Sequence, residues 1–296
     1  MNSFCHPPLL LIAALIFAPF MGSIHAQEKD ATYNLQPHPE QGTSFKVDSN
    51  TTIIQKDHYQ IFGEEDSKTS SETKIEIVQK YKDQIKKLND SNQPLKVHRT
   101  FEAFFTKFEI LKGEGAGKTD RQDAPLKGIS VTMDLGNPVK GPKQITAEFL
   151  KRFCGIDPSY WSMLPSKPVP IGHEWTARKV PAIFQNLLDL APPGTEATSI
   201  NLSFGLEEIL EHRGVRCARI RVTFLYKAEN KKERFTYKTD LYGNLFIDLA
   251  TGLPSEVNLR GDLESSQPPP ESEEGVTPEV KTEAKVTLAL TFSQIE

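Results

Sequence analysis

Apolar and polar residues alternate with a period of two along much of the chain. The alternation is clearest in "TSFKVDSNTTIIQ" (43–55), "PLKVHRTFEAFFTKFEIL" (94–111), "KGISVTMDL" (127–135), "RCARIRVTFLY" (216–226) and "AKVTLALTF" (284–292). Successive side chains of a β-strand point to opposite faces, so each segment is expected to be a strand with one buried face. The pattern predicts a mainly β (α+β) protein built on a curved antiparallel sheet or half-barrel, with a few short helices.

Five further segments are assigned from residue spacing and composition rather than from a period of two. Residues 73–88 fit both helical and strand spacing, and a strand is favoured because the turn at 89–94 joins them to a strongly β segment. Helices are predicted at 145–154 and 180–190, where apolar residues recur three and four apart. The segments 242–244 and 251–254 have the composition of hairpin turns.

The N-terminal segment has the pattern of a secretory signal peptide. An apolar run from Leu9 to Phe20 ends at small residues, with Ala26 before the polar "QEKD". Cleavage there predicts an exported protein, periplasmic or extracellular, and no later stretch is long and apolar enough to span a membrane. The domain organisation expected is a signal peptide at 1–26, a β-rich domain at 27–262 that is either continuous or two halves joined near 140–175, a flexible acidic Pro-rich loop at 263–283, and a strand at 284–296 that returns to the sheet.

Charge and glycine pattern argue against nucleic-acid and nucleotide partners. The net charge is −4 with both signs interspersed, and the basic run 80–87 lacks the arginines and aromatic residues of a nucleic-acid surface. "GEGAGKT" (113–119) resembles a phosphate-binding loop, but such a loop needs a glycine where Lys112 stands and a helix after it. A turn between two strands is the interpretation preferred.

The export prediction makes the cysteines relevant, because thiols can oxidise outside the cytoplasm. Cys154 and Cys217 remain after the signal peptide. A disulfide between them and two separate buried thiols both stay open, since Cys154 follows apolar residues at helical spacing and Cys217 falls on the other face of its strand from Ala218 and Ile220.

The sequence offers no catalytic, cofactor or metal site to predict. The histidines at 38, 58, 98, 173 and 212 lack the spacing of a helical metal site, and no Gly-x-Ser-x-Gly elbow is present. His173 and Glu174 are adjacent and would point to opposite faces of a strand. Asp240 and Asp248 flank the turn predicted at 242–244 and would face each other across it, although carboxylates near turns are usually solvated.

One segment resembles a known family. "MLPSKPVPIGHEW" (163–175) is similar to the Leu-Pro-x-x-Pro-Val-x-x-Gly-x-x-Trp segment of uncharacterised secreted bacterial proteins of the planctomycete type, and "NQPLKVHRTFEAF", "APLKGISVTMDL", "RGVRCARIRV" and "YGNLFIDLATGLPSEV" follow the order seen in them. The resemblance implies a fold similar to the periplasmic lipoprotein carriers, in which a half-closed barrel can enclose an apolar ligand. It brings no catalytic residues with it.

These observations favour a non-enzymatic exported protein that binds a partner or an apolar ligand, such as a lipid, through its sheet. The residues expected to line a ligand site are Phe101, Phe104 and Phe108, whose strand carries more aromatic residues than one face needs, and Trp175. Two alternatives stay open: a structural envelope protein whose aromatic residues only fill a core, and a hydrolase with dispersed catalytic residues.

Overall fold

The computed structural model describes residues 31–61, 68–91, 93–124, 126–134, 163–177, 195–267 and 278–295. Every helix or strand within these ranges is a β-strand, so the prediction of a mainly β protein is confirmed. The helices predicted at 145–154 and 180–190 lie outside the described residues, as does the signal peptide predicted at 1–26. No helix in the described ranges is long and apolar enough to cross a membrane.

Eight of the thirteen described strands have 14–21 residues, whereas five or six are typical of a globular protein. The thirteen strands are β1 (Thr32–Tyr33), β2 (Ser44–Ile61), β3 (Lys68–Leu88), β4 (Pro94–Lys112), β5 (Thr119–Asp123), β6 (Ser130–Asp134), β7 (Val169–Pro170), β8 (Glu174–Thr176), β9 (Glu196–His212), β10 (Val215–Asn230), β11 (Phe235–Asp248), β12 (Pro254–Gln267) and β13 (Pro278–Ile295).

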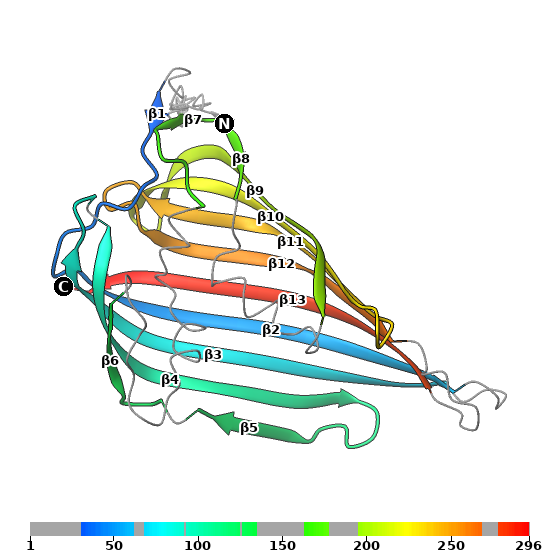
Figure 1. Cartoon of the computed structure of the whole chain (residues 1–296). Coiled ribbons are helices and arrows are strands. Elements are labelled where there is room, and N and C mark those ends of the chain that lie inside the picture. Colours follow the sequence, from blue (N-terminus) through cyan, green and yellow to red (C-terminus); the bar gives the residue numbers. More distant parts are fainter. Residues whose placement is uncertain are drawn as a thin grey trace, which may run out of the picture.

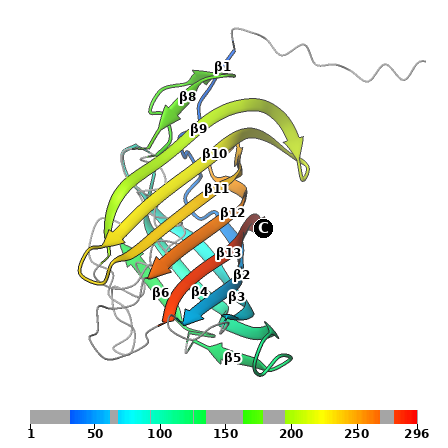
Figure 2. The ribbon, with the colours of Figure 1, turned by 90° about the vertical axis from the view of Figure 1, so that its right-hand side faces the viewer.

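Eleven of these strands form one antiparallel sheet. Its order is β5-β4-β3-β2-β13-β12-β11-β10-β9-β8, and β6 pairs with β4 beside β5 (Figure 1). Strands β1 and β7 form a separate two-stranded sheet near the β8 edge. Seen from the side, the large sheet is strongly twisted, and β9 and β10 bend along their length (Figure 2). The described strands therefore form a curved open sheet, as expected from the sequence.

Strand β13 joins the two halves of this sheet. It pairs with β12 on one side and with β2 on the other, where Ser44 lies opposite Ile295. The predicted strand at 284–296 is thus part of the sheet, but it starts earlier, at Pro278. The predicted loop at 263–283 is too long at both ends, because β12 continues to Gln267, which pairs with Val280.

Two glycines mark places where the sheet leaves no room for a side chain. Gly243 lies in the middle of β11 opposite Leu259, so the turn predicted at 242–244 is wrong. A Cβ atom at Gly243 would lie 1.8 Å from the carbonyl oxygen of Asn258, and one at Gly261 equally close to that of Asp240. Glycine at such positions lets neighbouring strands approach and the sheet bend. The other predicted turn, at 251–254, is confirmed: the Gly252 amide donates to the Asp248 carbonyl at 2.8 Å.

The structure also explains the strand predicted at 73–88 and the turn predicted at the glycine-rich segment. Residues 73–88 belong to strand β3, and the side chain of Asn89 closes the turn to β4 by accepting hydrogen bonds from the amides of Ser91 and Gln93, both at 2.9 Å. The glycine-rich segment 113–117 is a turn between β4 and β5. The amides of Gly117 and Lys118 donate to the carbonyls of Ile110 and Gly115, so they do not form a phosphate-binding nest.

Candidate functional site

The sheet has one apolar face, which we call the inner face. One row across it shows the pattern: Phe204, Val222, Gly243, Leu259 and Leu288 lie side by side on β9 to β13, and the row continues through Thr51, Ile77 and Thr106 on β2, β3 and β4. In the β9–β13 part, Phe204, Val222, Leu259 and Leu288 are buried. The opposite, outer face carries ion pairs such as Lys82–Glu102 and Lys238–Asp240. A one-sided apolar sheet of this size is a suitable wall for an apolar site.

Three of the predicted lining residues share the inner face of β4. Phe101, Phe104 and Phe108 pair with Tyr81, Gln79 and Ile75 of β3. Phe101 and Phe104 are three residues apart and would normally face opposite sides, but a β-bulge between them restores the same side. Phe101 is buried, whereas Phe104 and Phe108 are partly exposed. The next aromatic residue, Phe105, faces outward and its ring lies 3.8 Å from the Arg121 guanidinium carbon.

Trp175 lies far from these three residues along the sheet. It is on edge strand β8, opposite Phe204, and the two rings stack with centroids 5.5 Å apart. Its indole nitrogen donates to the carbonyl of Met163 at 2.7 Å. Glu174 points to the outer face, where it bonds Arg221, so it does not converge with His173, whose ring stacks on Trp175. The four predicted lining residues share a face but do not form one cluster.

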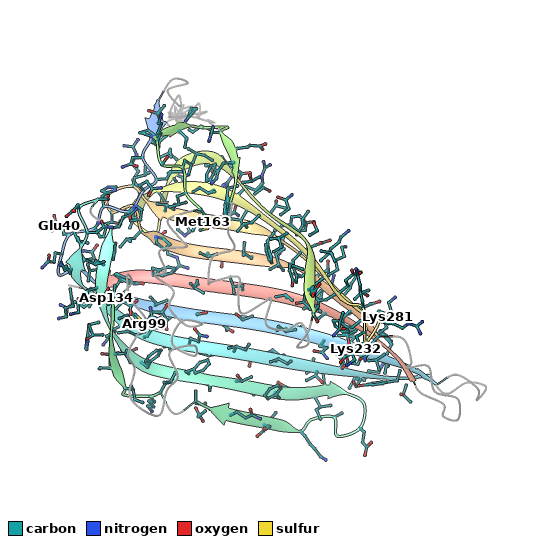
Figure 3. All side chains as sticks on the ribbon, viewed as in Figure 1. Glu40, Arg99, Asp134, Met163, Lys232 and Lys281 are labelled. Carbon is teal, nitrogen blue, oxygen red and sulfur yellow. The ribbon has the colours of Figure 1, made fainter. Side chains whose placement is uncertain are left out.

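A buried ion pair lies on the inner face beside Phe101. Arg99 of β4 donates from Nε and Nη2 to the two carboxylate oxygens of Asp83 on β3, at 2.7 and 2.6 Å. Both side chains are fully buried, and the guanidinium carbon of Arg99 is 3.7 Å from the centre of the Tyr81 ring. Figure 3 shows Arg99 at the end of the sheet opposite to that marked by Lys232 and Lys281. The pair cross-links β3 and β4 but offers no free charge to a ligand.

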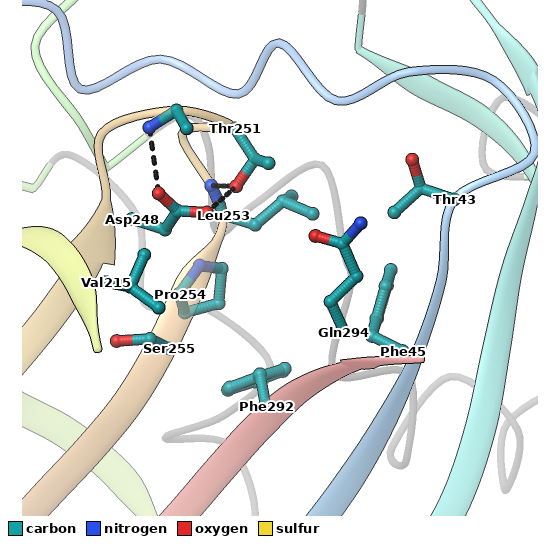
Figure 4. Close-up of a pocket in the computed structure, with 11 residues that line it drawn as sticks. Thr43, Phe45, Val215, Asp248, Thr251, Leu253, Pro254, Ser255, Phe292 and Gln294 are labelled. Carbon is teal, nitrogen blue, oxygen red and sulfur yellow. Dashed lines mark hydrogen bonds between the residues drawn. The ribbon is translucent and has the colours of Figure 1, made fainter. Parts of the chain in front are cut away.

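A cavity of about 310 Å³ lies at this same end of the sheet (Figure 4). Three parts of the chain, distant in sequence, bring its described lining together: the start of β2, the end of β13, and the β11–β12 turn with the adjoining start of β10. We call it the end cavity. The lining residues are Thr43, Phe45, Val215, Asp248, Ala250, Thr251, Leu253, Pro254, Ser255, Phe292 and Gln294.

The end cavity adjoins the inner face. Phe45 and Phe292 belong to the inner-facing series of β2 and β13: Phe292 lies opposite Val47, which in turn lies opposite Tyr81. Tyr81 pairs with Phe101, and their ring centroids are 6.2 Å apart. A row of inner-facing apolar residues, Phe292, Val47, Tyr81 and Phe101, thus runs from the cavity wall to the phenylalanine side of β4.

Two of the polar side chains that line the end cavity, those of Asp248 and Thr251, are hydrogen-bonded within the turn that forms it. The carboxylate of Asp248 accepts hydrogen bonds from the Ala250 amide at 2.8 Å and from the Thr251 hydroxyl at 2.9 Å. The Thr251 hydroxyl in turn accepts from the Leu253 amide at 3.2 Å. Gln294 is exposed, so its amide lies at the mouth of the cavity. Apart from these polar side chains and those of Thr43 and Ser255, the described lining is apolar.

A second cluster holds the β9–β10 hairpin against the cavity. The buried carboxylate of Glu256 bonds His212 at 3.0 Å and Arg213 at 2.5 Å. The His212 ring stacks on Phe246 with centroids 4.0 Å apart. Arg213 has a φ of 53°, a left-handed conformation that closes the tight hairpin and places Val215 in the cavity wall.

The N-terminal strap, which we define as residues 34–43, runs along the same end of the sheet (Figure 1). Leu35 is fully buried, and the side-chain amide of Gln36 donates to the backbone carbonyls of Leu164 and Pro165. His38 bonds the Thr251 carbonyl through its amide, at 2.7 Å. A Cβ atom at Gly252 would lie 2.1 Å from the Gln36 carbonyl oxygen, so glycine is required where the strap crosses the turn.

The residues considered for catalysis or disulfide formation do not form a reactive site in the described part of the chain. Asp240 and Asp248 lie on one strand rather than across a turn, so they do not face each other. No group of three or more metal-binding side chains occurs among the described residues. Cys217 is buried with its sulfur 3.5 Å from the Ser255 hydroxyl. Its predicted partner Cys154 lies outside the described residues, so the disulfide stays a prediction.

Sequence reasoning identified the inner face but missed the end cavity. Its β2 and β13 walls come from segments about 250 residues apart, as Phe45 and Gln294 are, and the pairing of β13 with β2 brings them together. The detectable signal was the Thr251–Pro254 turn close to Asp248. In the sequence, this segment is typical of an ordinary turn.

The comparisons with known proteins do not assign the chain to a family. No family model and no curated protein matches the chain. Among solved structures, a lipovitellin chain from a study of lipid–protein interactions is similar over 86% of this chain and 26% of its own, with 8% identity and a TM-score of 0.47. The chain thus spans about a quarter of that lipovitellin chain.

Proposed function

We propose that the protein is an exported, non-enzymatic binding protein that holds a lipid or another molecule with an apolar body in the end cavity. The observation that carries this proposal is the cavity itself: its described walls are largely apolar, and it adjoins an extended apolar sheet face. A preformed apolar cavity with a few polar groups at its rim is the usual form of a small-molecule site.

The volume limits the size of the ligand. An apolar protein cavity of about 150 Å³ is known to accept benzene, so about 310 Å³ accommodates a group of roughly twelve carbon atoms. A single alkyl chain of about ten carbons or a fused aromatic ring system fits this limit. A longer ligand would extend from the cavity past Phe45 and Phe292 toward the partly exposed Phe104 and Phe108 on the inner face.

Export and family membership form part of the same proposal. The segment 1–26 supports secretion, and the segment 163–175 supports membership in the secreted bacterial family with the Leu-Pro-x-x-Pro-Val motif. Expression of the full-length chain in a bacterium, followed by N-terminal sequencing of the periplasmic fraction, tests export. A mature chain that begins at Gln27 is expected, and an uncleaved cytoplasmic product would contradict it.

Ligand binding is tested on the purified protein. Native and denaturing mass spectrometry of one sample should reveal a lipid-sized mass that is lost on denaturation. In parallel, the neutral probe N-phenyl-1-naphthylamine should bind with an increase in fluorescence. A bare polypeptide mass together with no probe binding would contradict the proposal.

A blocking variant locates the site. Val215 lines the end cavity and is 36% exposed, so Val215→Trp can fill the cavity without a buried clash. It is expected to weaken probe binding at least about tenfold, because a filled cavity excludes an aromatic ligand. The matched control is Ile200→Trp, which adds the same indole at an exposed residue of β9 outside the cavity lining. Equal affinity in both variants would place the binding elsewhere.

A further inference from the structure

Asp248 gives the end cavity a negative wall. Among the described residues that line the cavity, it is the one charged side chain. Its carboxylate oxygens accept hydrogen bonds from the Ala250 amide and the Thr251 hydroxyl, which are both neutral donors. These bonds fix the position of the carboxylate but do not neutralise it.

No cation among the described residues forms an ion pair with Asp248. The guanidinium of Arg213, on the neighbouring hairpin, is bonded to Glu256 at 2.5 Å and is therefore already paired. Gln294 at the cavity mouth is neutral. A ligand that displaces water from the cavity thus meets an uncompensated negative charge in surroundings of low polarity, where electrostatic interactions are strengthened.

The charge of Asp248 also affects the pKa of the neighbouring Cys217 thiol. Burial raises the pKa of the Cys217 thiol, the hydrogen bond with Ser255 opposes the rise, and the negative charge of Asp248 adds to it. Cys217 pairs with Asp248 across β10 and β11. An anionic group brought into the cavity would experience the same repulsion, whereas an ammonium group would be attracted.

We infer that Asp248 makes the end cavity selective for charge, so that it binds cationic amphiphiles most tightly, neutral ones less tightly and anionic ones weakest. This inference rests on the proposed function and narrows its ligand class. The ligand would place its apolar chain against Phe45, Leu253 and Phe292, with its amine or hydroxyl group toward Asp248 and the Gln294 amide.

Three probes with the same ten-carbon chain test the inference. Decylamine, 1-decanol and decanoate are titrated below their aggregation concentrations at pH 7.5. The affinity of each is measured by displacement of N-phenyl-1-naphthylamine from the mature protein, which begins at Gln27. Decylamine is expected to bind at least about tenfold more tightly than decanoate, with decanol between them. The preference should shrink in high salt, but only partly, because a charge inside a cavity is screened less than an exposed one.

Two variants assign the preference to this site. Asp248→Asn keeps an oxygen to accept from Ala250 and is expected to bring the affinities of decylamine and decanoate within about threefold of each other. Gln294→Glu adds a second carboxylate at the exposed mouth, where folding is less affected, and should increase the preference severalfold. The control is Asp262→Asn, which makes the same charge change on the outer face, at an ion pair with Lys285, and should leave the preference unchanged.

The outcomes separate the inference from the proposed function. Equal binding of the three probes, or an unchanged preference in both Asp248→Asn and Gln294→Glu, would overturn the role of Asp248 while ligand binding stands. Absence of binding by every probe, including N-phenyl-1-naphthylamine itself, would overturn the proposed function and the inference with it.

Discussion

The buried pair Asp83–Arg99 allows a sharp test of how the inner face is stabilised. Replacing Arg99 with Met keeps a long apolar side chain but removes the positive charge. Asp83 then keeps its carboxylate at a fully buried position without either of its two short hydrogen bonds. An uncompensated buried charge is expensive, and breaking such a pair usually costs about 3–5 kcal/mol.

That cost is large relative to the stability of the whole protein. Domains typically unfold with a free energy of about 5–15 kcal/mol, so Arg99→Met removes a third or more of a mid-range value. Loss of the contact between Arg99 and the Tyr81 ring acts in the same direction. The double variant Asp83→Leu/Arg99→Met removes both charges, and its stability should return to within about 1 kcal/mol of the original protein, because an apolar pair avoids the desolvation cost.

Urea denaturation followed by circular dichroism measures these differences. The slope of unfolding free energy against urea is compared between variants, so that a change in midpoint can be attributed to stability. The control is Lys285→Met, which breaks the exposed pair with Asp262 and should cost less than about 1 kcal/mol. If Arg99→Met costs no more than this control, or if the double variant is as unstable as Arg99→Met, the reasoning is refuted.

Three other predictions concern strands β10 and β11. Gly243→Ala should lower the free energy of unfolding by about 1–3 kcal/mol in the same urea experiment, because its Cβ would overlap the Asn258 carbonyl; an unchanged midpoint would contradict the strand assignment. Burial raises the pKa of Tyr237 above its ordinary 10.0, so the unfolded chain loses this proton first. Stability should therefore fall by about 1.4 kcal/mol per pH unit above pH 10, and Tyr237→Phe should flatten that slope. Burial also raises the pKa of Cys217, so in a mature Cys154→Ser variant Ellman's reagent should label the native protein slowly at pH 8 and the urea-unfolded, reduced protein quickly; rapid native labelling of this variant would contradict the buried position.

The sequence pattern was sufficient for the type of the elements but not for their exact positions. Alternation identified β4, β10 and β13 because a one-sided sheet requires it. It failed at Gly243, since glycine between polar neighbours is typical of turns and its role here depends on contact with Asn258 of the next strand. Phe101 and Phe104 could not be assigned to one face either, because the bulge between them is visible only in the pairing with β3.

The candidate site depends on register, which the sequence does not reveal. Phe45 and Gln294 lie opposite each other because β13 enters the sheet beside β2, and no local pattern at either residue indicates this partner. Asp248 was considered only as a possible partner of Asp240 across a predicted turn, whereas its significance follows from the cavity that the 251–254 turn and the strand ends form together. Trp175, predicted to line the ligand site with the three phenylalanines, lies on edge strand β8, and its distance from β4 separates it from them.

The position of β13 has a consequence for folding kinetics. The contacts that unite β2–β4 with β9–β12 are between residues as far apart as Ser44 and Ile295, so the chain has a high contact order, which is associated with slow folding. Until β13 is in place, β2 and β12 are both open edges that can pair with other chains. Such a chain cannot complete its sheet until β13 is available, which is compatible with the export proposed above. A variant truncated before Pro278 is expected to aggregate rather than to fold into a smaller sheet.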